Sequence, residues 1–196
     1  MDTVKQQQVI SQYIDQYKTV IDKTLTALRA NKGNLHIPYA QFLFSVIDYY
    51  GLLYIVATRR KFNKRDKNNF LDFFASSYFP AVDRCKNSFL YFVRNGLIHQ
   101  IFSKASSVGT SPENKLFFKD TANGNIPALN LDYLDKGTIA AIDAFSNDLK
   151  TNATYIDNLH DILIAKNYGL NDHSELKSEL DCSFGGDINN VFEDCI

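Results

Sequence analysis

Three residues whose side chains handle protons and phosphates stand within one hexapeptide, Arg94-Asn95-Gly96-Leu97-Ile98-His99. A histidine titrates near neutral pH and serves as a general acid or base, whereas an arginine keeps its charge and matches the oxygens of a phosphate. Metal-free RNA cleavage needs both, because the 2′-OH loses a proton as it attacks the phosphate and the phosphorane gathers negative charge. The hexapeptide therefore predicts a catalytic site in which Arg94 stabilises the transition state, His99 moves the proton and Asn95 orients one of them.

The spacing of these residues also indicates where they lie. Asn95 and His99 are four positions apart and share one face of a helix, while Arg94 projects about 100° to the side. The motif follows an apolar stripe at helical intervals, which predicts that it ends a bundle helix: Val82, Cys85, Phe89, Phe92 and Val93. A structural interpretation stays open, because an arginine and a histidine at such an end can cap carbonyls and complement the helix dipole.

At these positions the sequence resembles the HEPN superfamily, whose members are small helical bundles that often act as ribonuclease toxins and antiphage effectors. The signature of that family is an arginine, usually followed by a polar residue, and a histidine a few positions later, near the end of a helix. Arg94, Asn95 and His99 match these three positions. In the subgroup that works beside a nucleotidyltransferase antitoxin, a tyrosine stands two residues after the histidine. Here that position is Ile101, which counts against that subgroup.

The resemblance implies a metal-independent endoribonuclease that leaves a 2′,3′-cyclic phosphate and works in bacterial defence or in a toxin–antitoxin pair. Single-stranded RNA or a nucleotide is the expected ligand, since the reaction uses the 2′-OH that DNA lacks. The resemblance also implies a homodimer that pairs along the motif helices, so that two Arg/His sets face one cleft. An antitoxin protein is a further partner that it suggests.

Two other classes of protein remain open. One is a non-catalytic HEPN-like module that binds a nucleotide, RNA or a protein partner through the same side chains, and the other is a plain helical interaction domain. No cofactor is expected. No metal is expected either, because the sequence has no acidic cluster and no histidine pair with ligand spacing. The remaining histidines, His36, His160 and His173, are predicted to lie at the surface.

A basic run follows the second apolar segment and is a second candidate for contacts with RNA. Its residues are Arg59, Arg60, Lys61, Lys64 and Arg65, with Lys67 just beyond. Lysines and arginines clustered in this way bind phosphates, although a solvated loop between two helices has the same composition. The run is therefore a candidate phosphate-binding patch beside the catalytic motif.

The net charge of −1 conceals two regions of opposite sign. Residues 168–196 contain seven acidic residues and one lysine, a net charge of −6, which leaves residues 1–167 with a net charge of +5. A basic domain is compatible with an RNA partner, whereas the overall charge alone would argue against one. We expect the acidic tail to screen the basic face or to compete for it.

The fold class predicted is all-α: an antiparallel bundle of four or five helices, with a small β or loop insertion before the last long helix. Apolar residues at helical spacing mark residues 10–28, 42–57, 70–78 and 139–163. Between them, residues 103–114 have the composition of a loop, and residues 116–118 and 126–129 flank Asn123-Gly124 as a loose hairpin. We predict one HEPN-like domain at 1–167, followed by the acidic tail at 168–196.

The segment from Phe42 to Ala57 is apolar enough to raise the question of a membrane span. It is short for that purpose and contains Asp48, so a buried core helix is the expectation. Cys85, Cys182 and Cys195 match no zinc or redox motif and are expected to be reduced thiols. Together these features predict a cytoplasmic protein without membrane contact.

Overall fold

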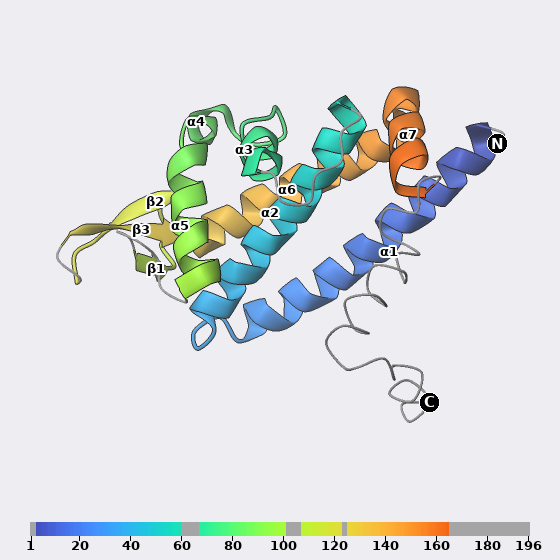
Figure 1. The fold of residues 1–196 in the computed structure, drawn as a ribbon. Coiled ribbons are helices and arrows are strands. Elements are labelled where there is room, and N and C mark those ends of the chain that lie inside the picture. The colour runs from blue at the N-terminus through green and yellow to red at the C-terminus, as the bar shows by residue number, and fades with distance from the viewer. Residues whose placement is uncertain (1–2, 60–66, 101–106, 123–124, 165–196) are drawn as a thin grey trace, which may run out of the picture.

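The computed structural model describes residues 3–59, 67–100, 107–122 and 125–164, which form a helical body with one small sheet at its end (Figure 1). The three strands precede the long helix α6, as predicted. The elements in chain order are α1 (Thr3–Ala30), α2 (His36–Arg59), α3 (Lys67–Phe74), α4 (Ala81–Arg84), α5 (Asn87–Gln100), β1 (Ser107–Gly109), β2 (Phe117–Asp120), β3 (Ile126–Asn130), α6 (Leu131–Thr151), α7 (Ala153–Leu159) and a π-helical turn (His160–Ile164). The predicted acidic tail at 168–196 lies outside the described residues.

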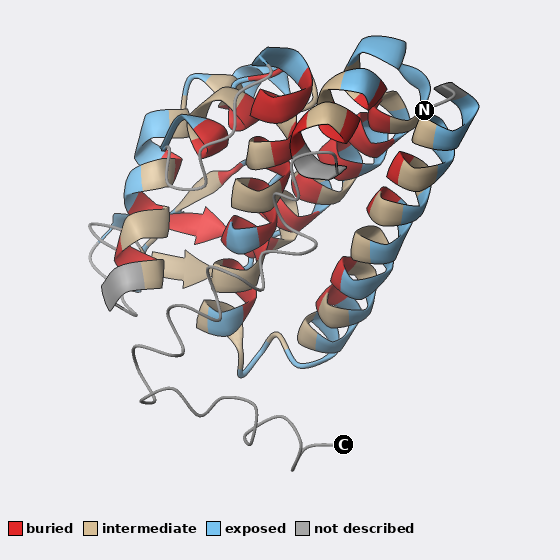
Figure 2. Ribbon diagram, turned by 45° about the vertical axis from the view of Figure 1, so that its right-hand side comes forward, coloured by how far each residue is buried: buried red, intermediate tan, exposed pale blue. Residues whose placement is uncertain are grey.

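Helix α2 lies at the centre of the fold and contacts α1, α3, α5, α6 and α7. It is apolar on nearly all sides, and its buried residues run from Tyr39 to Ala57 (Figure 2). The helix begins at His36, with Pro38 in its first turn, where a missing backbone N–H costs nothing. The predicted core helix is therefore confirmed, and it is longer at both ends than the apolar run indicated.

By length and composition alone, α2 is also the one helix in the described part of the chain that could cross a membrane. Of its most apolar window, 61% is buried inside the fold. A core helix that other helices cover has this same profile.

A glycine sets the close approach of α3 to α2. A Cβ atom at Gly51 would lie 2.2 Å from the backbone carbonyl oxygen of Asn69 and 2.6 Å from its carbonyl carbon. No side chain larger than hydrogen fits at that distance unless one helix moves. Gly51 thus allows Phe70, Phe73 and Phe74 of α3 to bury their rings in the core.

The sheet has the order β1-β3-β2, with β2 antiparallel and β1 parallel to β3. The pairing of Phe117 with Leu129 confirms the predicted hairpin. The prediction of a loop throughout 103–114 was wrong at Ser107–Gly109, because this short segment gains its ladder from Ala128–Asn130, twenty positions away. A pairing across that separation leaves no mark on the local composition.

Two helical stretches are shorter than their apolar patterns suggested. α3 ends at Phe74, so Tyr78 stands outside it in a turn before Pro80. The pattern over 139–163 is interrupted at Asn152, whose backbone is extended and whose Oδ1 accepts a hydrogen bond from the backbone N–H of Tyr155. Asn152 ends α6 and caps α7, because its side chain replaces a missing intrahelical acceptor.

The end of α1 is fixed to the start of α6 by ion pairs. Arg29 donates from Nε and Nη2 to the two different oxygens of Asp135, each at 2.7 Å, and the Asp135 side chain is only 12% exposed. Lys32 contacts Asp132 at 2.7 Å one turn earlier on α6. A paired, two-oxygen contact of this kind is the usual geometry of a structural arginine–carboxylate bridge.

Candidate functional site

The predicted motif lies on α5, which runs beside the first half of α2 (Figure 1). Leu90, Val93 and Leu97 bury the inner side of α5 in the core. Arg94 follows Val93 at the edge of that buried side, and its side chain is 17% exposed. α5 is described as far as Gln100, so the motif lies in the last described turns of a helix, as predicted. The predicted apolar stripe is corrected, because Val82, Cys85, Phe89 and Phe92 are exposed and only Val93 of that set is buried.

An acidic residue of α2 holds the guanidinium of Arg94. Nε of Arg94 lies 3.0 Å from Oδ2 of Asp48 and Nη2 lies 2.5 Å from the same oxygen. Asp48 is the acid that interrupts the apolar sequence of α2, and in the fold it faces α5. In the sequence, Asp48 argued only against a membrane span. A single acid in an otherwise apolar helix is also a sign that a basic residue pairs with it, and this sign pointed to Arg94.

Two further residues of α5 complete the surroundings of Arg94. Asn95 accepts a hydrogen bond at Oδ1 from Nη1 of Arg94 at 2.8 Å, and the ring of Tyr91 lies 5.5 Å from the guanidinium carbon. A guanidinium has five N–H groups, of which Asp48 and Asn95 engage three. Among the described residues, no further acceptor contacts the remaining N–H group on either terminal nitrogen. N–H groups of this kind can bind the oxygens of a phosphate.

The Asp48 carboxyl has a pKa above its usual value. Burial is the largest cause and raises it, while the hydrogen bonds and the charge of Arg94 lower it only in part. Asp48 is 28% exposed, so the group is neither fully solvated nor sealed in the core. Among the described residues, Arg94 is thus the one charged group that acts on this carboxyl.

The backbone of His99 forms part of the last turn of α5. Five residues separate it from Arg94, which corresponds to about 7.5 Å along a helix axis. The side chain of His99 lies outside the described part of the structure. The structure therefore places Arg94 and Asn95 in contact and His99 one turn further on the same helix.

A cavity of about 540 Å³ opens where α1 turns into α2. Its lining includes Asn34, His36, Ile37 and Gln41. The Gln41 side chain also donates a hydrogen bond at 2.7 Å to the carbonyl oxygen of Leu97. Gln41 therefore connects the lining of this cavity to the last described turn of α5.

Arg59, the one described residue of the predicted phosphate-binding set, is not beside this motif. Arg59 ends α2 and pairs with Asp72 of α3 at 2.7 Å. On a straight helix Arg59 lies about 27 Å from Gln41, which contacts the last turn of α5. The other predicted phosphate-binding residues, Arg60, Lys61, Lys64 and Arg65, fall outside the described residues.

Of the other histidines predicted to lie at the surface, His160 is buried instead, and His36 is partly exposed. His36 is the first residue of α2 and lines the same cavity as Gln41. His160 is 7% exposed, because the chain tightens into a π-helical turn that faces the start of α1, where Gln6 lies 3.4 Å from its Nδ1. His173 lies outside the described residues. Within residues 3–59, 67–100, 107–122 and 125–164, no group of three metal-binding side chains comes together.

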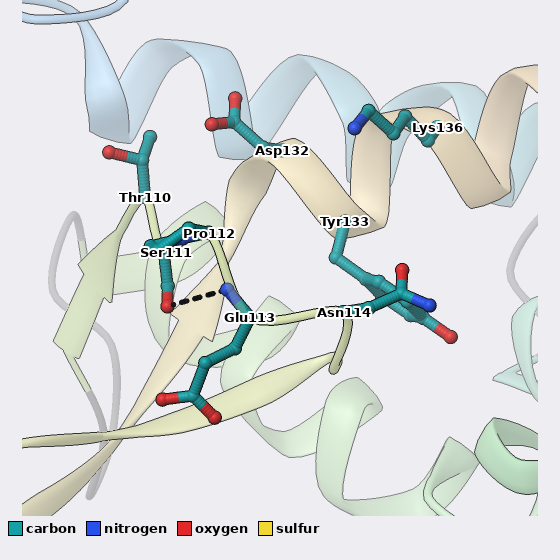
Figure 3. Close-up of a pocket in the computed structure, with 8 residues that line it drawn as sticks. All are labelled: Thr110, Ser111, Pro112, Glu113, Asn114, Asp132, Tyr133 and Lys136. Carbon is teal, nitrogen blue, oxygen red and sulfur yellow. Dashed lines mark hydrogen bonds between the residues drawn. The ribbon is translucent and has the colours of Figure 1, made fainter.

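A second cavity, of about 370 Å³, lies between the 110–114 loop and the first turns of α6 (Figure 3). Asn130 gives the loop its shape from a fully buried position. Its Nδ2 donates to the carbonyls of Ser111, Glu113 and Lys115, and its Oδ1 accepts from the Ser111 N–H. Sequence analysis did not anticipate this role, because the contacts link positions up to nineteen residues apart.

No protein-family model matches the chain, and the search of curated proteins found no match either. The comparison with solved structures likewise found none.

Proposed function

We propose that the chain is a metal-independent endoribonuclease of the HEPN type, built on an antiparallel bundle of the long helices. The observation that carries the proposal is that the side chain of Arg94 is held in one orientation. Asp48, Asn95 and Tyr91 hold its guanidinium, and among the described residues no further acceptor contacts the remaining N–H group on either terminal nitrogen. A guanidinium fixed in advance stabilises the charge of a phosphorane without reorganising during the reaction.

The reaction proposed is attack of a ribose 2′-OH on the adjacent phosphate, which releases the 5′-oxygen and leaves a 2′,3′-cyclic phosphate. Arg94 binds the nonbridging oxygens, Asn95 keeps the guanidinium oriented and His99 transfers a proton. The cavity lined by His36 and Gln41 is connected by Gln41 to the last described turn of α5 and has room for a nucleotide base. Single-stranded RNA is the proposed substrate, because a duplex would not place an unstacked base there.

We also propose that the active form is a homodimer paired along α5. Phe89 and Phe92 are 37% and 43% exposed, and the helical spacing places Phe92 in one row with Asn95. Large aromatic side chains on one exposed helix row are typical of an interface. A second chain on this row brings a second Arg94 and His99 to the same face. A cytoplasmic setting, in bacterial defence or beside an antitoxin, is part of the proposal.

A second candidate is a non-catalytic module that binds a nucleotide, RNA or a protein partner. The observation that favours it is the ion pair itself, because Asp48 neutralises the charge of Arg94 in the free protein. Such an arginine also serves a purely structural role between α2 and α5.

Incubation of the purified protein with mixed single-stranded RNA in EDTA separates these functions. For the ribonuclease we expect cleavage products with cyclic phosphate ends, strongly reduced cleavage by Arg94→Ala and His99→Ala, and an unchanged rate for the surface control Asp143→Asn. Cleavage that survives both substitutions contradicts the proposed site. RNA binding without cleavage supports the module, and neither activity supports the structural role.

A further inference from the structure

We infer that Asp48 is a second proton-transfer group of the site, the base that accepts the proton of the attacking 2′-OH. This inference rests on the proposed ribonuclease function and extends it. Cleavage by a 2′-OH moves two protons, because one must leave the nucleophile and another must reach the departing 5′-oxygen. Each chain offers one histidine in the motif, and Asp48 is the described carboxyl group in contact with Arg94.

The geometry of the ion pair distinguishes Asp48 from Asp135, the acid that pairs with Arg29. Both N–H groups of Arg94 bind the same oxygen, Oδ2. No described residue donates a hydrogen bond to Oδ1 of Asp48. In the Arg29–Asp135 pair, by contrast, each carboxylate oxygen accepts its own hydrogen bond. Asp48 thus keeps one oxygen available to a hydroxyl beside the guanidinium that would hold the phosphate.

The Asp48 side chain is also partly exposed. Its exposed fraction is 28%, close to the 29% of Asp72 in the pair with Arg59 and above the 12% of Asp135. A base must reach the proton it removes, so partial exposure is required of it. Burial also keeps the pKa of Asp48 above its usual value, which makes the carboxylate a stronger base than a solvated one.

The step balances without any co-reactant. Asp48 takes the proton of the 2′-OH while the O2′–P bond forms, and Arg94 stabilises the charge on the phosphorane. The P–O5′ bond then breaks, and a protonated His99 gives its proton to the 5′-oxygen. Exchange with water returns Asp48 to the carboxylate and His99 to the imidazolium.

The test compares Asp48→Asn with the wild type, because an amide oxygen still accepts the hydrogen bonds of Arg94 but cannot take up a proton. We would measure kcat and KM for a single-stranded RNA oligonucleotide in EDTA across a pH series. For Asp48→Asn we expect kcat to fall by about 10²- to 10⁴-fold with little change in KM, and the acid limb of the pH profile to disappear. Asp143→Asn, a surface acid on α6, serves as the matched control.

A second variant keeps the inference testable if the amide perturbs folding. Asp48→Glu retains a carboxylate and should keep the acid limb, and added formate should restore part of the cleavage lost in Asp48→Ala. If Asp48→Asn cleaves RNA at a rate within a few fold of the wild type and keeps the acid limb of the pH profile, Asp48 only positions Arg94. The inference about Asp48 then fails, while the proposed ribonuclease function stands. If the wild type does not cleave RNA, the proposed function fails and this inference fails with it.

Discussion

Gln41 of α2 donates a hydrogen bond from its side-chain amide to the carbonyl oxygen of Leu97 in α5, with 2.7 Å between the two atoms. Leu97 lies in the last described turn of α5. The contact therefore anchors the end of the motif helix to the start of the core helix. Gln41 also lines the cavity beside His36, so the contact connects that cavity to the same end.

Replacement of Gln41 by leucine should loosen the end of α5. The Leu97 carbonyl would lose the Gln41 donor in a partly buried position, which costs about 1 kcal/mol of unfolding free energy. Urea unfolding measures that cost. Amide hydrogen exchange should become faster in the last turn of α5 and stay unchanged in α1. Equal protection of that turn in the variant and the wild type would show that the hydrogen bond does not hold it.

The contact at Gly51 predicts a large loss of stability for a very small substitution. Gly51→Ala places a Cβ atom 2.2 Å from the Asn69 carbonyl oxygen, so α3 must move away from α2. Overpacking of this kind costs about 3 kcal/mol, or more where backbone must shift. Gly137→Ala is the matched control, since a Cβ there meets no atom within 4 Å. We expect the control to stabilise α6 by up to about 1 kcal/mol, and equal unfolding midpoints for the two variants would contradict the packing.

The raised pKa of Asp48 predicts how stability depends on pH. The native carboxyl binds a proton more readily than the unfolded one, whose pKa is near 3.8. The contribution of Asp48 is therefore fully present below pH 3.8 and is lost as the pH rises through the native pKa. Relative to Asp48→Asn, the wild type should lose stability as the pH rises through that window.

Urea unfolding of both proteins between about pH 3 and pH 7 measures this difference. Arg94→Ala removes the group that lowers the pKa, so the loss should extend to higher pH in that variant. A wild type that gains stability relative to Asp48→Asn as the pH rises from 3 to 7 would reverse the sign and contradict the burial of this carboxyl.

Local periodicity was enough to predict the helices that surround the motif. The apolar stripes located α1 and α2, and the hairpin residues located β2 and β3. These elements follow from residues close to one another in the chain. The stripe predicted for the motif helix was wrong in its face, because Val82, Cys85, Phe89 and Phe92 are exposed and α5 begins only at Asn87. The single acid in α2 was visible as well, but its partner Arg94 stands forty-six positions later, and a pairing at that separation leaves no periodic signal.

Contacts between residues far apart in the sequence also explain why β1 and the burial of His160 were not predicted. β1 gains its hydrogen bonds from β3, and His160 is buried because the π-helical turn faces the start of α1. Arg59 was predicted to belong to a phosphate-binding patch beside the motif. In the fold, α2 carries Arg59 to the end opposite the last described turn of α5. A short separation in the sequence therefore did not predict a short distance in the fold for this residue.

The exposed aromatic side chains of α5, Phe89 and Phe92, predict how two copies of the chain associate. Phe92→Glu places a charge on a side chain that is 43% exposed in the single chain and would be buried in the proposed dimer. We expect light scattering to show a dimer for the wild type at micromolar concentration and a monomer for the variant, because an unpaired charge cannot be buried in an interface. RNA cleavage should fall together with the dimer. Val20→Glu, on the outer face of α1 at 58% exposure, should leave both unchanged. A monomeric wild type, or a Phe92→Glu variant that stays dimeric, would rule out pairing through this row.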